Sequence, residues 1–146
     1  MPACTFFGHR DCLTDIIPQL RRTILELIDQ ENVDLFYVGN QGFFDMYAET
    51  LLREISQHHS QIRYFVVLAY LPFSTDTIIA PEPYTTIFPQ GIEHVPKKFA
   101  ISYRNRWMLE RSDYIVTYVT RPFGGAAKFR EMAYKKAKNV IDLKKP

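Results

Sequence analysis

Apolar residues follow two alternating patterns along this chain. Short continuous runs of aromatic and β-branched residues are typical of strands that are covered on both faces of a sheet. Between these runs, apolar residues recur every three or four positions, as on one side of an amphipathic helix. The runs predict five strands, at about 3–8, 34–39, 62–69, 113–119 and 139–143. The periodic segments predict four helices, at about 13–31, 43–58, 98–111 and 125–138.

The alternation of strands and helices predicts the fold class. Successive strand–helix units form a parallel sheet with right-handed crossovers and helices on both faces. We therefore expect a single α/β domain over residues 1–146, a doubly wound, Rossmann-like three-layer sandwich with a five-stranded parallel sheet. In such sheets ligands bind beyond the carboxyl ends of the strands, near the point where the strand order reverses. The loops that follow the strands are thus where a site is expected.

The connection between Leu71 and Lys97 departs from this alternation. It contains five prolines and several aromatic residues, and it shows no helical or strand periodicity. A loop of this length within a small domain is usually functional. Two interpretations stay open, a lid or binding loop and an arm that packs against a second copy of the chain.

Composition and charge narrow the classes of function. The chain has 146 residues, of which 47% are hydrophobic and 23% charged, so it is able to bury a substantial core. A formal net charge of +2 is small for a nucleic-acid-binding domain, and a small anionic ligand is the better expectation. The sequence shows no secretory leader and no apolar run long enough to span a bilayer, so we expect a cytoplasmic protein without a membrane partner.

The two cysteines fit that compartment. Cys4 lies within the first apolar run and is expected in the core, whereas Cys12 follows a turn and is expected to be partly exposed. Both are expected to be reduced thiols without a catalytic role. The histidines show no metal-ligand spacing with one another or with the cysteines, so no metal site is expected.

Candidate ligand-binding residues follow the first predicted strand. Gly8 permits a sharp turn and the close approach of a ligand, and Arg10 has the planar guanidinium that suits phosphate or carboxylate. His9 has two interpretations, a donor or proton-transfer group for the ligand, or a side chain hydrogen-bonded to neighbouring backbone. Arg10 is equally compatible with a solvated surface charge.

A second candidate loop follows the next strand. Its two glycines and two amides, at the opening of a helix, predict a turn that contacts a phosphate or a ribose, although a plain tight turn uses similar residues. Asp45 is either an acceptor for ribose hydroxyls or an acidic residue of the first helical turn. The candidate residues are Gly39, Asn40, Gln41, Gly42, Phe43 and Asp45.

The segment 104–131 is the most informative part of the chain. Its apolar strand leads into Gly124 and Gly125 at the start of a helix, where free backbone N–H groups and the helix dipole favour an anion. The segment predicts a phosphate site with an arginine before the strand and a glutamate after the glycines. The residues singled out here are Arg104, Asn105, Phe123, Gly124, Gly125, Ala126 and Glu131.

This segment resembles the signature of the lysine-decarboxylase-like nucleotide 5′-monophosphate phosphoribohydrolases. The matching positions are Arg104, Met108, Ser112, Asp113, Gly124, Gly125 and Glu131. Asn105 stands where that family has lysine, and Phe123 stands where it has proline. Together with the FFGHR and YVGNQGFFD runs, nearly the whole chain resembles a small bacterial or phage branch of the SLOG superfamily. That superfamily contains those hydrolases, the DNA-processing protein DprA, and sensor domains for nucleotide-derived signals such as cyclic ADP-ribose variants.

The resemblance implies three functions. The first is binding of a nucleotide-derived small molecule, of ADP-ribose or nucleoside phosphate type, by a sensor or sequestering protein, with Phe43, Tyr70 or Phe123 stacking on the base. The alternative is N-glycosidic hydrolysis of nucleotides, in which the catalytic pair is Arg104 and Glu131. Binding of single-stranded DNA is a weaker alternative. No cofactor is implied, and relatives suggest a homodimer or larger homo-oligomer.

Overall fold

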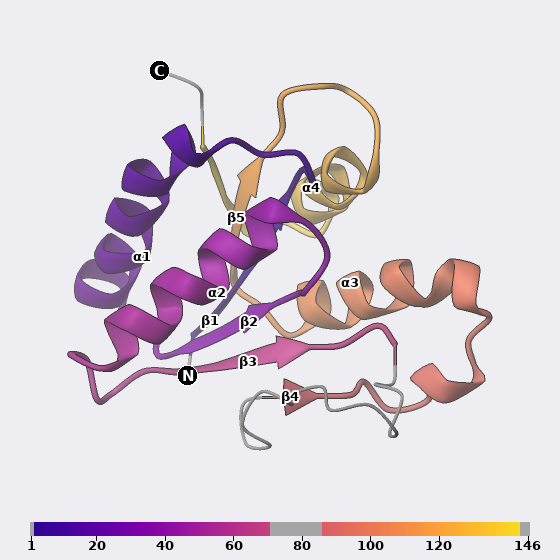
Figure 1. Cartoon of the computed structure of the whole chain (residues 1–146), viewed down its shortest axis with the longest axis horizontal. Helices are drawn as coiled ribbons and strands as arrows, with labels where there is room; N and C mark the ends of the chain where they lie inside the picture. The colour runs from indigo at the N-terminus through magenta and orange to yellow at the C-terminus, as the bar shows by residue number, and fades with distance from the viewer. Residues whose placement is uncertain (1, 71–85, 144–146) are drawn as a thin grey trace.

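A parallel sheet forms the centre of the molecule, which a computed structural model describes for residues 2–70 and 86–143 (Figure 1). The sheet has six strands in the order β4-β3-β2-β1-β5-β6, and each neighbouring pair is parallel. The strands are β1 (Ala3–Gly8), β2 (Leu35–Val38), β3 (Arg63–Val67), β4 (Thr86–Ile87), β5 (Tyr114–Tyr118) and β6 (Asn139–Asp142).

The strand count corrects the expectation of five. The additional strand, β4, lies within the proline-rich connection and pairs with the edge strand β3, Val66 with Thr86 and Val67 with Ile87. Two residues are too few to show any periodicity, so the hydrophobic pattern could not predict them. Two short 3-10 turns follow, η3 (Ile92–His94) and η4 (Lys97–Phe99). Residues 71–85, on which the lid and arm interpretations also rest, lie outside the described residues.

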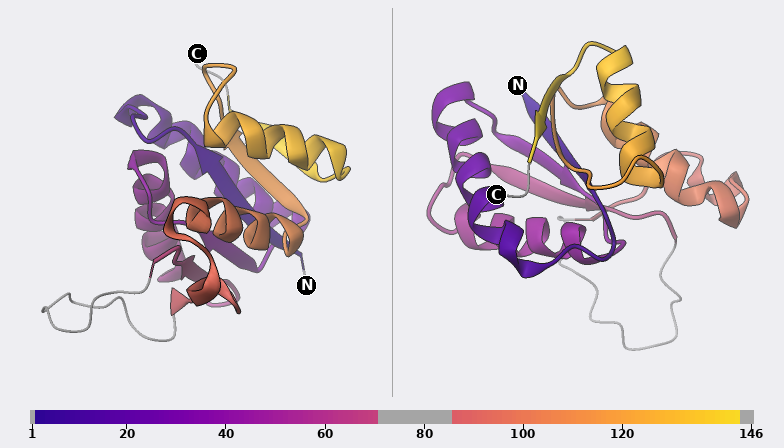
Figure 2. Two further views of the ribbon diagram at one scale, coloured as in Figure 1. Left: turned by 90° about the vertical axis from the view of Figure 1, so that its right-hand side faces the viewer. Right: turned by 90° about the horizontal axis from the view of Figure 1, so that it is seen from above.

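Two helices cover each face of the sheet, giving the expected three layers (Figure 2). One face carries α1 (Ile17–Glu31), which the short turn η1 (Thr14–Ile16) precedes, and α2 (Phe43–Ser56). The other face carries α3 (Ala100–Glu110) and α4 (Gly125–Lys135). In the described part of the chain, no helix combines the length and the apolarity that crossing a membrane requires.

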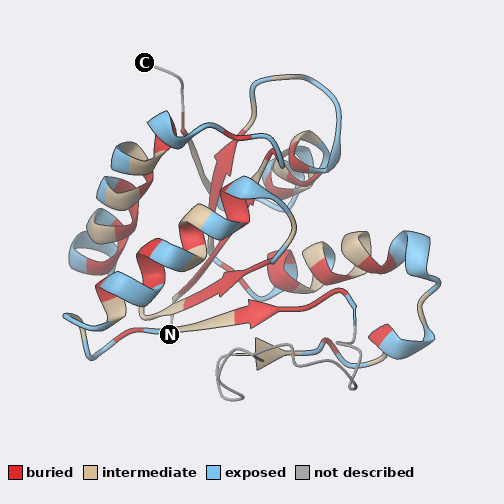
Figure 3. Ribbon diagram, in the orientation of Figure 1, coloured by how far each residue is buried: buried red, intermediate tan, exposed pale blue. Residues whose placement is uncertain are grey.

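Each face of the sheet has its own apolar core, because successive residues of a strand point to opposite sides. In β1, Phe6 packs among the side chains of α1 and α2, whereas Phe7 stacks on Phe129 of α4 with ring centroids 5.3 Å apart. The central strands are buried almost throughout, while the helices expose their outer sides (Figure 3). The continuous apolar runs of the sequence thus correspond to strands that helices cover on both faces of the sheet.

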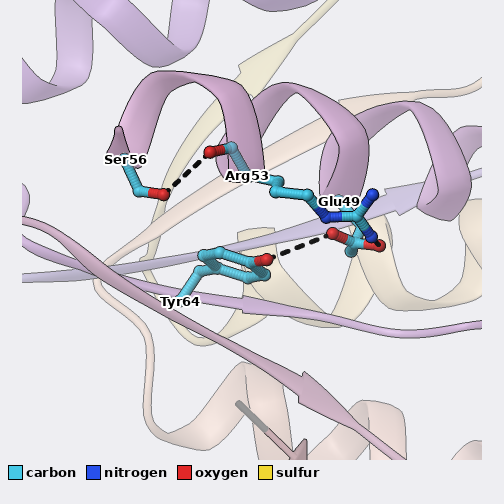
Figure 4. Close-up of polar contacts among 4 residues, drawn as sticks. All are labelled: Glu49, Arg53, Ser56 and Tyr64. Atoms are coloured by element: carbon cyan, nitrogen blue, oxygen red, sulfur yellow. Dashed lines mark hydrogen bonds and ion pairs between the residues drawn. The ribbon is translucent and has the colours of Figure 1, made fainter. Parts of the chain in front are cut away.

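A hydrogen bond joins α2 to β3, and further polar contacts lie within α2 (Figure 4). The Tyr64 hydroxyl donates to the Glu49 carboxylate at 3.3 Å, and the Arg53 guanidinium pairs with the same carboxylate one helical turn away. The Ser56 hydroxyl donates to the Arg53 carbonyl oxygen at 2.9 Å. Tyr64 thus links the middle of α2 to β3.

Both cysteines are interior residues. Cys4 lies in the core as expected, but Cys12 is also buried, which corrects the expectation of partial exposure. Burial raises the pKa of the Cys12 thiol to about 11 and raises that of Cys4 as well. Both side chains therefore stay protonated thiols at neutral pH, without the thiolate that a nucleophile requires.

Candidate functional site

A cavity of about 390 Å³ lies beyond the carboxyl ends of β1 and β5. These strands are neighbours in the sheet, but the chain reaches β5 only after adding β2, β3 and β4 on the other side of β1. The order of the strands therefore reverses here, which is where doubly wound sheets bind ligands. The predicted residues that line the cavity are Gly8, His9, Arg10, Gln41, Asp45, Arg104, Asn105, Gly124, Gly125 and Ala126.

Five residues that were not among the predicted site residues also line the cavity. They are Phe6, Phe7, Asp11, Ile101 and Arg121. Asp11 and Arg121 lie three residues beyond the ends of their strands, so a wider window after each strand would have included them. Ile101 is one apolar residue among many in its helix, and nothing in the sequence distinguishes it.

The N-terminus of α4 presents free backbone to this cavity. Gly124 precedes the helix with φ 96°, no side chain caps it, and the first intrahelical bond runs from the Lys128 N–H to the Gly124 carbonyl. The N–H groups of the first helical residues consequently have no acceptor within the helix. A Cβ atom placed on Gly124 or on Gly125 would meet no protein atom within 4 Å. Space and donors for an anion therefore coincide here.

His9 holds the loop after β5 in place. The Thr120 backbone N–H donates to His9 Nε2 at 2.9 Å, so the ring proton of the neutral imidazole is on Nδ1. Burial and the nearby Arg121 guanidinium lower the pKa of His9, which keeps the ring neutral at pH 7. The structure thus supports the interpretation of a histidine bound to backbone, and the same ring lines the cavity.

An ion pair joins the loops that follow β1 and β5. Arg121 donates through both terminal nitrogens to the two Asp11 carboxylate oxygens, at 3.1 and 3.2 Å. The Arg121 guanidinium also lies 5.7 Å from the ring centroid of Phe123. Phe123 is 67% exposed and is not among the cavity-lining residues, so its proposed place beside a base is not assembled in this structure.

Arg104 is a buried cation in the cavity wall. It is only 2% exposed and occupies the inward side of α3 together with Ala100 and Met108. Its Nε donates to Asn105 Oδ1 at 2.8 Å, and its Nη1 donates to the Val67 carbonyl at 3.1 Å and to Asn40 Oδ1 at 3.3 Å. Burial lowers the pKa of Arg104, but a guanidinium keeps its proton in proteins.

Asp45 is the buried anion of the same cavity. It lies in the first turn of α2, is 8% exposed, and accepts the Gln41 backbone N–H at 2.9 Å. Burial raises the pKa of Asp45 to about 6, against the opposing effects of Arg104 and Arg10. A Cβ atom on Gly39 would lie 2.8 Å from both Arg104 Nη1 and Asp45 Oδ2. Gly39 therefore allows the two charged groups to approach one another.

Several predicted residues build the surroundings of the cavity without lining it. Gly42 precedes α2 with φ 99°, and a Cβ atom there would lie 2.5 Å from Arg10 Cα. Phe43 donates its backbone N–H to the Arg10 carbonyl at 2.9 Å, while its half-exposed ring stacks on Tyr47. Asn40 contacts Arg104 from outside the cavity lining.

Glu131 is not brought to the cavity. It is exposed on α4, whose buried side consists of Ala126, Phe129 and Ala133. It is absent from the cavity lining, so the expected pair of Arg104 and Glu131 is not assembled. The carboxylate that does lie with Arg104 is Asp45. Within residues 2–70 and 86–143, no group of three His, Cys, Asp or Glu side chains is arranged to hold a metal ion.

Comparison with known proteins bears on the fold. Neither a scan of protein-family models nor a search of curated proteins gives a match. The structure is similar to the X-ray structure of DNA processing protein A (DprA) from Streptococcus pneumoniae, with a TM-score of 0.75 and 16% sequence identity. The match covers 100% of this chain and 51% of the DprA chain, so this chain spans about half the length of that protein. The shared feature is a Rossmann-like α/β fold, a parallel sheet with helices on both faces.

Proposed function

We propose that this chain binds a nucleotide-derived small molecule, of ADP-ribose or nucleoside phosphate type, as a sensor or sequestering protein. The observation that carries the proposal is the uncapped N-terminus of α4, which faces the same cavity as Arg10, Arg104 and Arg121. Charge-assisted hydrogen bonds to a phosphate contribute about 1.5–3 kcal/mol each. A few of them therefore supply the roughly 8 kcal/mol that corresponds to micromolar binding.

The size and composition of the cavity support a ligand of this class. A volume of about 390 Å³ falls at the lower end of the range for small-molecule sites, which is about 300–1,000 Å³. Three arginines and two aspartates line it, and the Asp11 carboxylate is paired with Arg121. The excess of positive charge suits a phosphate, and the small residues at Gly124, Gly125 and Ala126 leave it room.

Calorimetry with AMP, ADP, ADP-ribose and cyclic ADP-ribose tests the proposal. We expect at least one of these to bind with micromolar affinity, and a Gly125→Val variant to bind it at least tenfold more weakly. Val at this position would place methyl groups in front of the free N–H groups. Lys135→Val, at the exposed last residue of α4, is the matched control and should change the affinity less than twofold. The absence of heat with every ligand at high protein concentration would refute the proposal.

Hydrolysis of an N-glycosidic bond is a second proposal, which rests on Arg104 in the cavity and on the Asp45 carboxyl, whose pKa burial raises to about 6. Incubation with nucleotides followed by chromatography for the free base tests it. Release of base that is lost in Asp45→Asn and retained in Glu131→Gln would assign the acid–base role to Asp45. If both variants released as much base as the wild type, neither carboxyl would have a catalytic role.

Other expectations from the sequence stay predictions. Light scattering at working concentration tests the homodimer or larger homo-oligomer, and a monomer would contradict it. A salt-dependent mobility shift with oligonucleotides tests binding of single-stranded DNA. The similarity to a DNA processing protein makes that experiment worthwhile, although at 16% identity the likeness extends to the fold alone.

A further inference from the structure

The buried charges of the cavity have hydrogen-bonding atoms that the protein leaves unused. Asp45 uses Oδ2 to accept the Gln41 N–H, and no described residue donates to its Oδ1. Arg104 uses Nε and Nη1, and within the described residues no acceptor lies at its Nη2. Both side chains are more than nine-tenths buried, and both line the cavity. Neither atom is among the buried polar atoms that lack a partner in the described part of the chain, so both are accessible from the cavity and open to a ligand or water.

The two groups lie side by side without forming an ion pair of their own. Both approach the same position on Gly39, yet no nitrogen–oxygen distance between them falls within the 4 Å of a salt bridge. The Asp45 carboxylate thus remains available to a third group. The cavity wall here combines a carboxylate acceptor with a guanidinium donor.

This combination suits a pair of hydroxyl groups better than a phosphate. Each hydroxyl of a vicinal diol donates one hydrogen bond and accepts others, so it matches an adjacent acceptor and donor. A phosphate has only acceptors at neutral pH, and the Asp45 carboxylate would repel it. The free N–H groups of α4 serve the phosphate instead. In a nucleotide the ribose is bonded to the phosphate, whereas the base is one group further away.

We propose that Asp45 and Arg104 bind the 2′,3′-diol of the ligand's ribose, so that the site accepts ribonucleotides and rejects 2′-deoxyribonucleotides. The inference rests on the proposed function, because it assigns the sugar of the same ligand. Removing one ligand hydroxyl leaves a buried polar group of the protein unpaired, which is the most discriminating kind of mismatch.

The test compares matched pairs of ligands, AMP, GMP and CMP against their 2′-deoxy counterparts, by calorimetry at pH 7.5. We expect each bound ribonucleotide to be preferred at least tenfold. The preference should fall below threefold in Asp45→Asn, which removes the charged acceptor. Asp29→Asn, at an exposed position of α1 outside the cavity lining, is the control and should keep the full preference.

A second measurement avoids any question of whether a variant folds. Lowering the pH to 5 protonates Asp45, whose pKa is about 6, so the wild-type preference for ribose should narrow. The charged and titratable groups around it are Arg10 and Arg104, with His9, Asp11 and Arg121 in the same cavity. The ligand phosphate also titrates near pH 6, but equally in both members of a pair, so it cancels in the ratio.

The outcomes separate the two proposals. Equal binding of both sugars, or a preference that depends on the base alone, would overturn the assignment of Asp45 and Arg104 to the diol and leave the proposed function standing. No binding by any of the six nucleotides, nor by ADP-ribose, would overturn the proposed function and this inference with it.

Discussion

Helices α2 and α4 begin in the same way and face different surroundings. Each follows a parallel strand, and each is preceded by a glycine with positive φ, 99° at Gly42 and 96° at Gly124, without a side-chain cap. At α2 the protein fills the space, since a Cβ atom on Gly42 would lie 2.5 Å from Arg10 Cα. At α4 the same test finds no atom within 4 Å. The space beside the glycine is therefore filled by Arg10 at α2, whereas at α4 no protein atom fills it.

The comparison extends to charge at the third helical position. In α2 this position is Asp45, a carboxylate at the positive end of the helix dipole. In α4 the corresponding residue is Ala127, and the first turn contains no acidic residue. Helix α2 carries its own anion, whereas α4 has none. This difference is why we assign the phosphate to α4 and the sugar to the neighbourhood of Asp45.

The largest expected effect is a difference in unfolding free energy between the Gly42→Ala and Gly124→Ala variants. Gly42→Ala forces an L-residue into a glycine conformation, at about 1–3 kcal/mol, and adds a contact with Arg10 that costs about 1–3 kcal/mol more. Gly124→Ala incurs only the first of these costs. Urea denaturation of both variants measures the difference. Equal losses of unfolding free energy would show that the neighbourhood of Gly42 is not closed as described.

The next largest effect concerns the pH dependence of stability. The pKa of Asp45 in the folded protein is about 6, above its ordinary value, so the folded state binds more protons than the unfolded state between about pH 4 and 6. The contribution of Asp45 to stability is therefore full below about pH 4 and is lost as the pH rises through 6. Asp45→Asn should gain about 1–2 kcal/mol relative to wild type between pH 4.5 and 7.5. Denaturant titrations at both pH values measure this change, and parallel curves would contradict it.

Giving α4 its own anion should weaken ligand binding. Ala127→Asp places a carboxylate at the position equivalent to Asp45, where it complements the dipole and competes with a bound phosphate. We expect about tenfold weaker binding, equivalent to about 1.4 kcal/mol, with a helix that is no less stable. Ala127→Asn, which has the same shape without the charge, is the control. Equal affinities of the two variants would argue against a phosphate at this helix.

The smallest effect is the expected tolerance of Gly125. Its φ is not in the left-handed region, and a Cβ atom there would meet nothing, so Gly125→Ala should change the unfolding free energy by less than about 0.5 kcal/mol. Thermal denaturation measures this directly. A larger loss would mean that Gly125 has a structural role, and that its small size does not serve a ligand.

Most of the fold could be predicted from hydrophobic periodicity, because buried strands and amphipathic helices leave long, regular patterns. The exception was β4, whose two residues are held by pairing with β3 and by no pattern of their own. The position of the cavity also agrees with the expectation of a candidate site beyond the strand ends. Its details did not, because the position of Asp45 next to Arg104 depends on how α2 and α3 pack, and no local pattern specifies that.

The position of Glu131 outside the cavity has a physical cause that can be found in the sequence. Residues of a helix are about 100° apart around its axis, so Glu131 lies nearly opposite Phe129, two residues earlier. Phe129 is buried against the sheet, and Glu131 therefore points outward. Arg104 shows the converse, since it shares the apolar side of α3 with Ala100 and Met108. A charged residue on the apolar side of a helix, such as Arg104, is therefore a better candidate for the cavity than one on the outer side, such as Glu131.

The position of β1 in the sheet has a consequence for how the protein is made. This strand comes first in the chain, yet one of its two neighbours is β5, and the Ala3 N–H donates to the Asp113 carboxylate across 110 residues at 3.0 Å. Contacts so distant in sequence form slowly, because the intervening chain must be ordered before they contribute. During synthesis, the second edge of β1 stays uncovered until residues 114–118 of β5 have been made. The cavity, which residues from the loops after β1 and β5 line, is likewise complete only when both strands are in place.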